Sequence, residues 1–278
     1  MRTLDSRVLR PDRHLARGPA LALAVALIGC HPPSPTTIAN HAGSGSAIRV
    51  EAAALPGWLA LAPRADRQTG ADWLPVSTVA SVIVPDLNPR TPPAPMTAVG
   101  ADGTAAAVTL GEPATIGYGC DGGTLAAMTA RGPAMAPGIV WLVPRDLPSG
   151  WHPRGIPLVV REHAAHHARW QAGDATVDVH ITGDAGGTLT IDGNGAHHAE
   201  DFEVHMMDGA DAPHLSLDED RPIATPIPVA AFEVVPDGAI IVVAMIAGYE
   251  GVTLSSWLVD HGEVAAAPLS LYLYQCAF

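Results

Sequence analysis

After residue 48 the chain consists of short apolar runs separated by glycine, proline and Asp-Gly pairs. The 278 residues include 28 Gly and 26 Pro, and both residue types interrupt helices and mark turns. Short apolar runs between turn signals are typical of β-strands. We therefore expect an all-β, mostly antiparallel fold for residues 48–278, either a sandwich or a barrel-like sheet, with few or no helices. A loop rich in Pro, Gly and Trp near residue 150 is where this region could divide into two β units.

Two segments make this strand pattern more specific. Asp102-Gly103 lies between two apolar runs, residues 96–99 and 105–110, and predicts a tight hairpin. Residues 239–247 read Ala-Ile-Ile-Val-Val-Ala-Met-Ile-Ala and are apolar on both faces of a strand. A strand without a polar face is typically buried on both sides. We therefore expect this strand at the centre of a sheet.

Residues 175–192 predict a further hairpin, because apolar and polar residues alternate in both halves. For the two apolar sets to share one side, the numbers of paired residues must add up to an even value. The shortest loop that fits is Asp184-Ala185-Gly186, with Gly186 at positive φ. This register places Asp178 opposite Asp192. Because like charges in opposition are unfavourable, we expect a solvated strand end or a nearby cation there; the pair could also supply the two carboxylates of a hydrolase.

Residues 1–30 differ in character from the rest of the chain. An apolar stretch, residues 19–28, is too short to cross a bilayer and ends in Leu27-Ile28-Gly29-Cys30. The arginines that precede it are Arg2, Arg7, Arg10, Arg13 and Arg17. This arrangement resembles the lipobox signal peptide of bacterial lipoproteins.

The resemblance implies that residues 1–29 are removed as a signal peptide and that the new terminal Cys30 carries acyl chains. Two or three such chains anchor a protein stably to a membrane, whereas one chain binds reversibly. The alternative is a soluble secreted protein whose leader happens to end in Cys30.

The segment that follows, residues 30–47, combines prolines with Gly and Ser. Such a composition cannot bury a core, so we expect a flexible tether between the lipidated Cys30 and the β-rich domain. The residue after Cys30 is His31. In the enteric lipoproteins that the leader resembles, Asp at this position favours retention in the inner membrane. We therefore expect an outer-membrane lipoprotein that faces the periplasm or the cell surface, and not a cytoplasmic protein.

The charge of the chain restricts its partners. The formal net charge is −13, and every basic residue is Arg. Removal of residues 1–29 takes away five basic and two acidic residues, which leaves 10 basic and 26 acidic residues and a net charge of −16. Such a surface repels phosphate backbones, so we expect no nucleic-acid partner. The membrane, through the lipid on Cys30, and another envelope protein are the expected partners.

Two cysteines remain after Cys30, namely Cys120 and Cys276. An even number of cysteines in an oxidising compartment predicts one disulfide, which here would link a middle strand to the last one. The alternative is two separately buried thiols.

Histidines form the most conspicuous cluster of side chains that could carry chemistry. They are His163, His166, His167, His180, His197, His198 and His205. Neutral imidazole binds zinc and copper, so a divalent metal site is one hypothesis. On a continuous strand His163 and His167 would share one face and His166 the other, so only part of the set could converge. The alternative is a polar, exposed β surface.

No usable nucleophile motif, phosphate-binding glycine loop or zinc-protease motif is present in the sequence. We therefore assign no residue a catalytic role. The sequence favours a non-enzymatic envelope domain that acts in binding, scaffolding or surface presentation. The alternative is a metal-binding protein or metal-dependent hydrolase built on the histidines.

Overall fold

The computed structural model describes residues 48–62, 82–85, 94–117, 124–183, 186–204, 215, 225–236, 238–247 and 251–274. The described residues are all-β, as the sequence predicts, and their only helix is one 3₁₀ turn, η1 (Ala52–Ala54). Within these ranges no helical segment has the length and apolar character needed to cross a membrane. Cys30, Cys120, His205 and Cys276 lie outside the described residues, so the lipidation site and the disulfide stay predictions.

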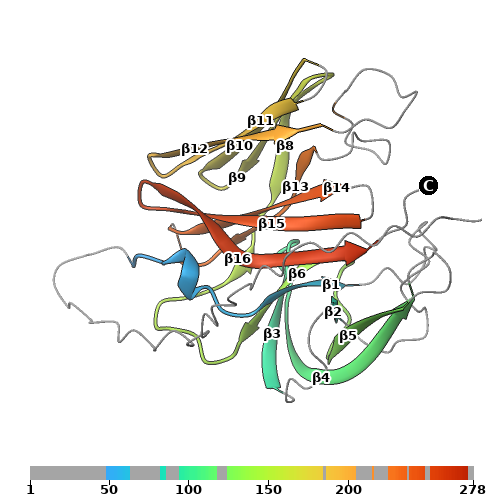
Figure 1. The fold of residues 1–278 in the computed structure, drawn as a ribbon. Helices are drawn as coiled ribbons and strands as arrows, with labels where there is room; N and C mark the ends of the chain where they lie inside the picture. Colours follow the sequence, from blue (N-terminus) through green and yellow to red (C-terminus); the bar gives the residue numbers. More distant parts are fainter. Residues whose placement is uncertain are drawn as a thin grey trace, which may run out of the picture. The chain divides into compact units, whose positions relative to one another are not determined.

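The first six strands close into an antiparallel barrel in the order β1-β2-β5-β4-β3-β6 (Figure 1). These strands are β1 (Trp58–Ala62), β2 (Val82–Pro85), β3 (Ala94–Gly100), β4 (Ala105–Gly117), β5 (Thr124–Arg131) and β6 (Gly138–Pro144). The predicted Asp102-Gly103 hairpin is confirmed. It joins β3 to β4, and Gly103 adopts a φ of 87°.

The remaining strands form two five-stranded antiparallel sheets. We call one the outer sheet; it runs in the order β12-β11-β10-β9-β8. Its strands are β8 (Leu158–Ala164), β9 (His167–Ala172), β10 (Ala175–Thr182), β11 (Gly186–Gly193) and β12 (Ala196–Glu203). The other, the middle sheet, runs in the order β16-β15-β14-β13-β7. Its strands are β7 (Arg154–Gly155), β13 (Pro226–Glu233), β14 (Ile240–Ala247), β15 (Gly251–Asp260) and β16 (Glu263–Tyr274).

The middle sheet is buried on both faces, since it packs against the outer sheet on one side and against the barrel on the other (Figure 1). Strand β14 makes this clearest. Ile241 and Val243 point into the cluster shared with the barrel, whereas Ile240 and Val242 point into the cluster shared with the outer sheet. The prediction that the strand within residues 239–247 is central is confirmed, because its two apolar faces serve two cores.

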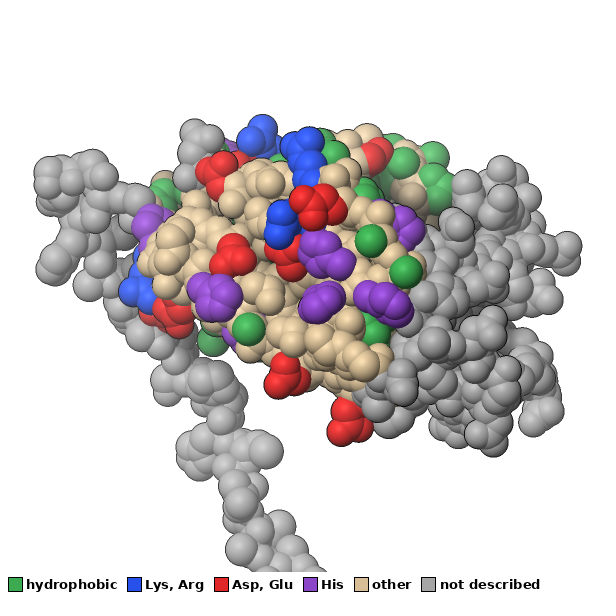
Figure 2. Space-filling model, turned by 90° about the horizontal axis from the view of Figure 1, so that it is seen from above, with side chains coloured by type: hydrophobic (Ala, Val, Ile, Leu, Met, Phe, Trp, Pro, Cys, Tyr) green, Lys and Arg blue, Asp and Glu red, His purple; other side chains and the backbone are tan. Residues whose placement is uncertain are grey.

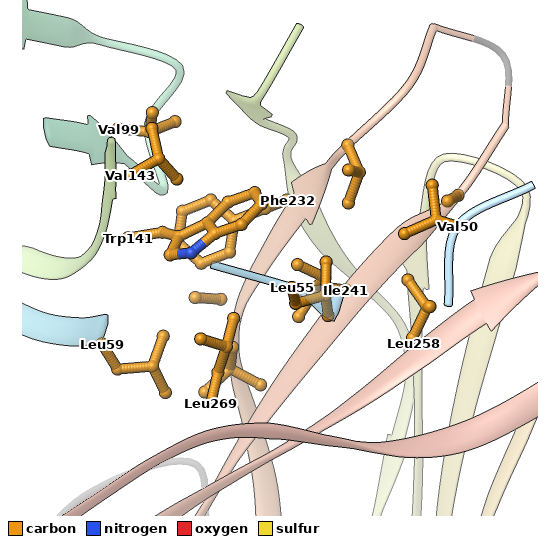
Figure 3. Packing of buried hydrophobic residues seen from close by; sticks show 14 of the residues in the cluster. Val50, Leu55, Leu59, Val99, Trp141, Val143, Phe232, Ile241, Leu258 and Leu269 are labelled. Carbon is orange, nitrogen blue, oxygen red and sulfur yellow. The ribbon is translucent and has the colours of Figure 1, made fainter. Parts of the chain in front are cut away.

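The contact between barrel and middle sheet centres on Trp141 of β6 (Figure 3). Its ring is fully buried and lies 6.0 Å from the ring of Phe232 on β13, at an interplanar angle of 59°. Trp141 Nε1 donates a hydrogen bond to Pro56 O at 3.0 Å. The architecture therefore changes between Pro144 and Arg154, close to the predicted boundary near residue 150, but the two parts share a core.

The hairpin of residues 175–192 has a register that differs from the prediction. The numbers of paired residues add up to an even value, as predicted. However, Thr182 pairs with Gly186, so the loop comprises residues 183–185 and not 184–186. Gly183, at a φ of 69°, supplies the left-handed residue that the prediction assigned to Gly186. The whole ladder is displaced by two positions, and Asp178 faces Thr190 instead of Asp192.

Candidate functional site

The solvent-exposed face of the outer sheet carries several of the histidines and carboxylates that the sequence analysis named as candidate site residues. Strands β9, β10 and β11 alternate buried apolar residues with partly exposed polar ones, so the apolar set covers the middle sheet and the polar set faces outward. We call this outward set the polar face. It comprises Glu162, His167, Arg169, Gln171, Thr176, Asp178, His180, Thr188, Thr190, Asp192, His197 and Asp201. Figure 2 shows histidines and carboxylates gathered there around arginine.

Four of these side chains form a closed network over β8, β9 and β10. Asp178 Oδ1 accepts a hydrogen bond from Arg169 Nε at 2.8 Å and lies 2.9 Å from His167 Nε2. Arg169 Nη1 also donates to Glu162 Oε1 at 3.2 Å, and His167 Nδ1 lies 3.6 Å from Glu162 Oε2. One arginine and one histidine therefore bridge two carboxylates on the neighbouring strands.

The electrostatics of the network favour the charged form of its arginine. The hydrogen bond to Asp178 raises the pKa of Arg169 above its ordinary value, the charges of Asp178 and Glu162 add to this, and partial burial opposes it. Arg169 remains 41 % exposed, so the network lies at the surface and is accessible to solvent and salt.

Two further histidines belong to the polar face. His197 Nδ1 lies 2.7 Å from Asp192 Oδ1 across the β11–β12 pair. The ring of His180 meets that of His167 edge-on, with centroids 6.0 Å apart. The polar face therefore contains His167, His180 and His197.

The other predicted histidines do not join them. His163 points toward the inner side of the outer sheet, where its Nε2 lies 3.1 Å from Leu215 O. His166 lies in the exposed turn between β8 and β9, and His198 of β12 points inward beside Glu200. The expectation that His163 shares a face with His167 is wrong. The chain turns at residues 165–166 and Ala164 pairs with His167, so His163, which precedes Ala164, lies on the opposite face. Glu162 pairs with Arg169 and takes the outward position.

The histidines are thus divided between the two sides of the outer sheet. The residues that the structure describes contain no group of three or more His, Cys, Asp or Glu side chains placed to hold a metal ion. Within those residues the geometry gives no support to the hypothesis of a divalent metal site.

The predicted carboxylate pair is also not formed as expected. Asp178 lies opposite Arg169 on one side and Thr190 on the other, whereas Asp192 lies opposite Thr176 and His197. Each carboxylate has its own basic partner. Arg169 lies beside Asp178, but the opposition of Asp178 and Asp192, from which a nearby cation or a solvated end was expected, does not form. With Oδ1 of Asp178 already held by Arg169 and His167, the arrangement suits a rigid polar surface better than a pair of carboxylates acting on one bond.

A second site was not anticipated from the sequence. Asp260, at the end of β15, has a side chain that is only 5 % exposed. Its Oδ2 accepts a hydrogen bond from Val50 N at 2.8 Å, and its Oδ1 accepts one from His261 Nδ1. A cavity of about 380 Å³ adjoins it. Asp260-His261-Gly262 reads as an ordinary turn, so only its burial against the distant segment around Val50 distinguishes it.

Comparisons with known proteins add no relative: no family model matches the chain, and neither the curated proteins nor the solved structures yield a match.

Proposed function

We propose that this protein is a lipid-anchored bacterial envelope protein, held in the outer membrane through Cys30, whose β-rich body acts by non-enzymatic binding or surface presentation. The observation that carries the proposal is the sequence Leu27-Ile28-Gly29-Cys30 at the end of an arginine-led apolar stretch. A signal peptide of this kind delivers the body to the envelope and leaves the acylated Cys30 as its first residue.

The length of the tether supports a body that stands away from the membrane. Residues 31–47 follow Cys30, and an extended chain spans at most about 3.3–3.6 Å per residue, so that the tether could reach roughly 55–60 Å. A flexible, proline-containing chain would on average span less than this limit. The body then has freedom to meet partners in the space beside the membrane.

The polar face supports binding over catalysis. The hydrogen bonds that link Glu162, Arg169 and Asp178 fix these side chains on a sheet instead of a loop, which gives a preorganised surface. The carboxylates of this face outnumber its single arginine. A partner with a basic surface therefore fits better than nucleic acid or another acidic molecule.

Lipidation is tested by expressing the full chain in a Gram-negative bacterium fed with an alkyne-tagged fatty acid. We expect the tag on the wild-type protein and on His31→Ser, and none on Cys30→Ser. Mass spectrometry of the purified protein should place the acyl groups on an N-terminal Cys30. An unmodified chain that retains residues 1–29 would contradict the proposal.

The membrane is tested separately by density-gradient fractionation of the same cells. We expect the wild type in the outer-membrane fractions and His31→Asp shifted toward the inner membrane in an enteric host. If the wild type and His31→Asp were distributed equally between the two membranes, the argument for the outer membrane would fall, while lipidation would be unaffected.

A further inference from the structure

A cavity separates the segment that enters the domain from the β15–β16 hairpin. Its volume is about 380 Å³, which lies in the range of small-molecule sites. Its lining residues are Arg49, Val50, Glu51, Ala52, Ala53, Leu258, Asp260, Glu263 and Ala265. Figure 3 shows two of them, Val50 and Leu258, where the entering segment meets the middle sheet. The cavity is therefore bounded by two parts of the chain that are about two hundred residues apart in the sequence.

The apolar part of the lining is made of short aliphatic side chains. Ala52 and Ala53 come from η1, Ala265 from β16 and Leu258 from β15. None of the lining residues is aromatic. Small aliphatic walls leave room for a narrow alkyl chain and offer no ring on which a flat or quaternary group could stack.

The charged part of the lining is predominantly acidic. Three carboxylates, Glu51, Asp260 and Glu263, face one guanidinium. That guanidinium, Arg49, donates to Glu263 Oε2 at 2.5 Å. The local charge that remains comes from Glu51 and Asp260, and it favours a cation over an anion or a zwitterion.

Asp260 is the side chain in this wall that is built to receive a donor. It is almost fully buried, with 5 % of its side chain exposed. A carboxylate offers about four acceptor positions, and the hydrogen bonds from Val50 N and His261 Nδ1 occupy one on each oxygen. The remaining acceptor positions suit the N–H groups of an ammonium, which a tetra-alkylated nitrogen lacks.

We propose that this cavity binds a small aliphatic primary amine in its ammonium form. The ammonium donates hydrogen bonds to Asp260, and the alkyl chain lies against Ala52, Ala53 and Ala265. The site is separate from the polar face of the outer sheet and does not depend on lipidation, so it can fail or hold independently of the proposed envelope role.

The test uses the full chain purified in detergent and butylammonium chloride as the probe, with binding followed by calorimetry. We expect saturable one-to-one binding in the millimolar range and at least tenfold weaker binding to Asp260→Asn. Asp146→Asn removes the same charge from an exposed position outside both the cavity and the polar face, and should bind as the wild type does. Tetramethylammonium and butyrate should not compete.

Ala265→Leu provides a second variant, since it enlarges a lining side chain while Asp260 itself is unchanged, and it remains informative if Asp260→Asn fails to fold. We expect it to weaken butylammonium binding at least tenfold as well. Absence of saturable binding to the wild type overturns the proposal. So does equal competition by tetramethylammonium, or unchanged affinity in a folded Ala265→Leu variant.

Discussion

Arg169 lies directly opposite Asp178 in the β9–β10 pair, and its Nε donates a hydrogen bond to Asp178 Oδ1 at 2.8 Å. On its other side Arg169 lies opposite Glu162 of β8, which accepts a second hydrogen bond. The register of three neighbouring strands therefore brings one cation between two carboxylates. These ion pairs hold the side chains on the exposed face of the outer sheet in place. The opposite face is held by its apolar core.

A double-mutant cycle tests the coupling between these two residues. Arg169→Met and Asp178→Asn should each lower the free energy of unfolding, and the double variant should lose less than the sum of the two, because either single change removes the same interaction. The coupling should shrink in 1 M salt, since the pair is accessible to solvent. Denaturant titrations measure all four chains. Arg161→Met, at the bulge of β8, is the matched control and should show no coupling with Asp178→Asn.

The register of this sheet shows what sequence reasoning can and cannot fix. Alternation requires an even sum for the 175–192 hairpin, and the structure agrees. Several registers satisfy that condition, and the loop decides among them. Gly183 and Gly186 are both glycines that could adopt positive φ, so the local sequence does not distinguish the two loops. The two loops differ in what lies opposite Asp178, which is Thr190 in the structure and would be Asp192 in the predicted register, so the structure avoids the opposition of like charges.

The faces on which the histidines lie could not be predicted for a related reason. Alternation along one strand says nothing about faces across a turn, and the turn at residues 165–166 places His163 on the side opposite His167, since Ala164 pairs with His167. The all-β class, by contrast, follows from residues such as Asp102-Gly103 and from the two-sided apolar pattern of residues 239–247, whose signals are local. The division into a barrel and two sheets depends on long-range pairing that alternation does not encode.

Trp141 should make the barrel and the middle sheet unfold together. Its buried ring packs on Phe232, so truncation in Trp141→Ala removes a contact between the two parts. We expect a loss of about 3–5 kcal/mol for Trp141→Ala, and a change within about 0.5 kcal/mol for Val159→Ala, whose side chain is exposed. Thermal unfolding of the wild type followed by calorimetry should show one transition for residues 48–278. Two well-separated transitions would mean that the shared core does not couple the parts.

Trp141→Phe distinguishes ring packing from the hydrogen bond to Pro56 O. The phenyl ring preserves much of the apolar contact, but Pro56 O loses the N–H that it accepts at 3.0 Å. We expect a loss of about 1–3 kcal/mol, smaller than that of the alanine variant. Equal losses for both variants would show that the hydrogen bond contributes nothing separable from the ring.

Asp102 should contribute a pH-dependent increment to stability. Hydrogen bonding by Thr104 Oγ1 holds the pKa of Asp102 below its ordinary value of 3.8, with Thr104 N adding to the effect and burial opposing it. A carboxyl whose pKa is lower in the folded state stabilises the fold above its unfolded pKa and loses that contribution as the pH falls through the folded pKa.

Asp102→Asn isolates this effect because the amide keeps an acceptor oxygen and removes the charge. At pH 7 the wild type should be more stable than the variant by less than about 1 kcal/mol, since the turn is exposed. The difference should be fully present well above the ordinary pKa of 3.8 and should vanish as the pH falls through the lower pKa of the folded state. Urea titrations across this range measure it. A difference that grows on acidification would have the wrong sign for a depressed pKa.

Gly57 should be the glycine at which alanine is tolerated least. It adopts a φ of 91°, and a Cβ at this position would lie 1.8 Å from Leu142 O, which is backbone and cannot move aside without disturbing β6. Gly183 adopts a similar φ of 69° but has nothing within 4 Å of such a Cβ. Gly183→Ala therefore reports the backbone strain alone, about 1–2 kcal/mol, whereas Gly57→Ala adds a clash and should lose more than about 4 kcal/mol or fail to fold. Equilibrium unfolding of the two variants side by side measures the difference, and equal losses would show that the entering segment yields freely around Leu142.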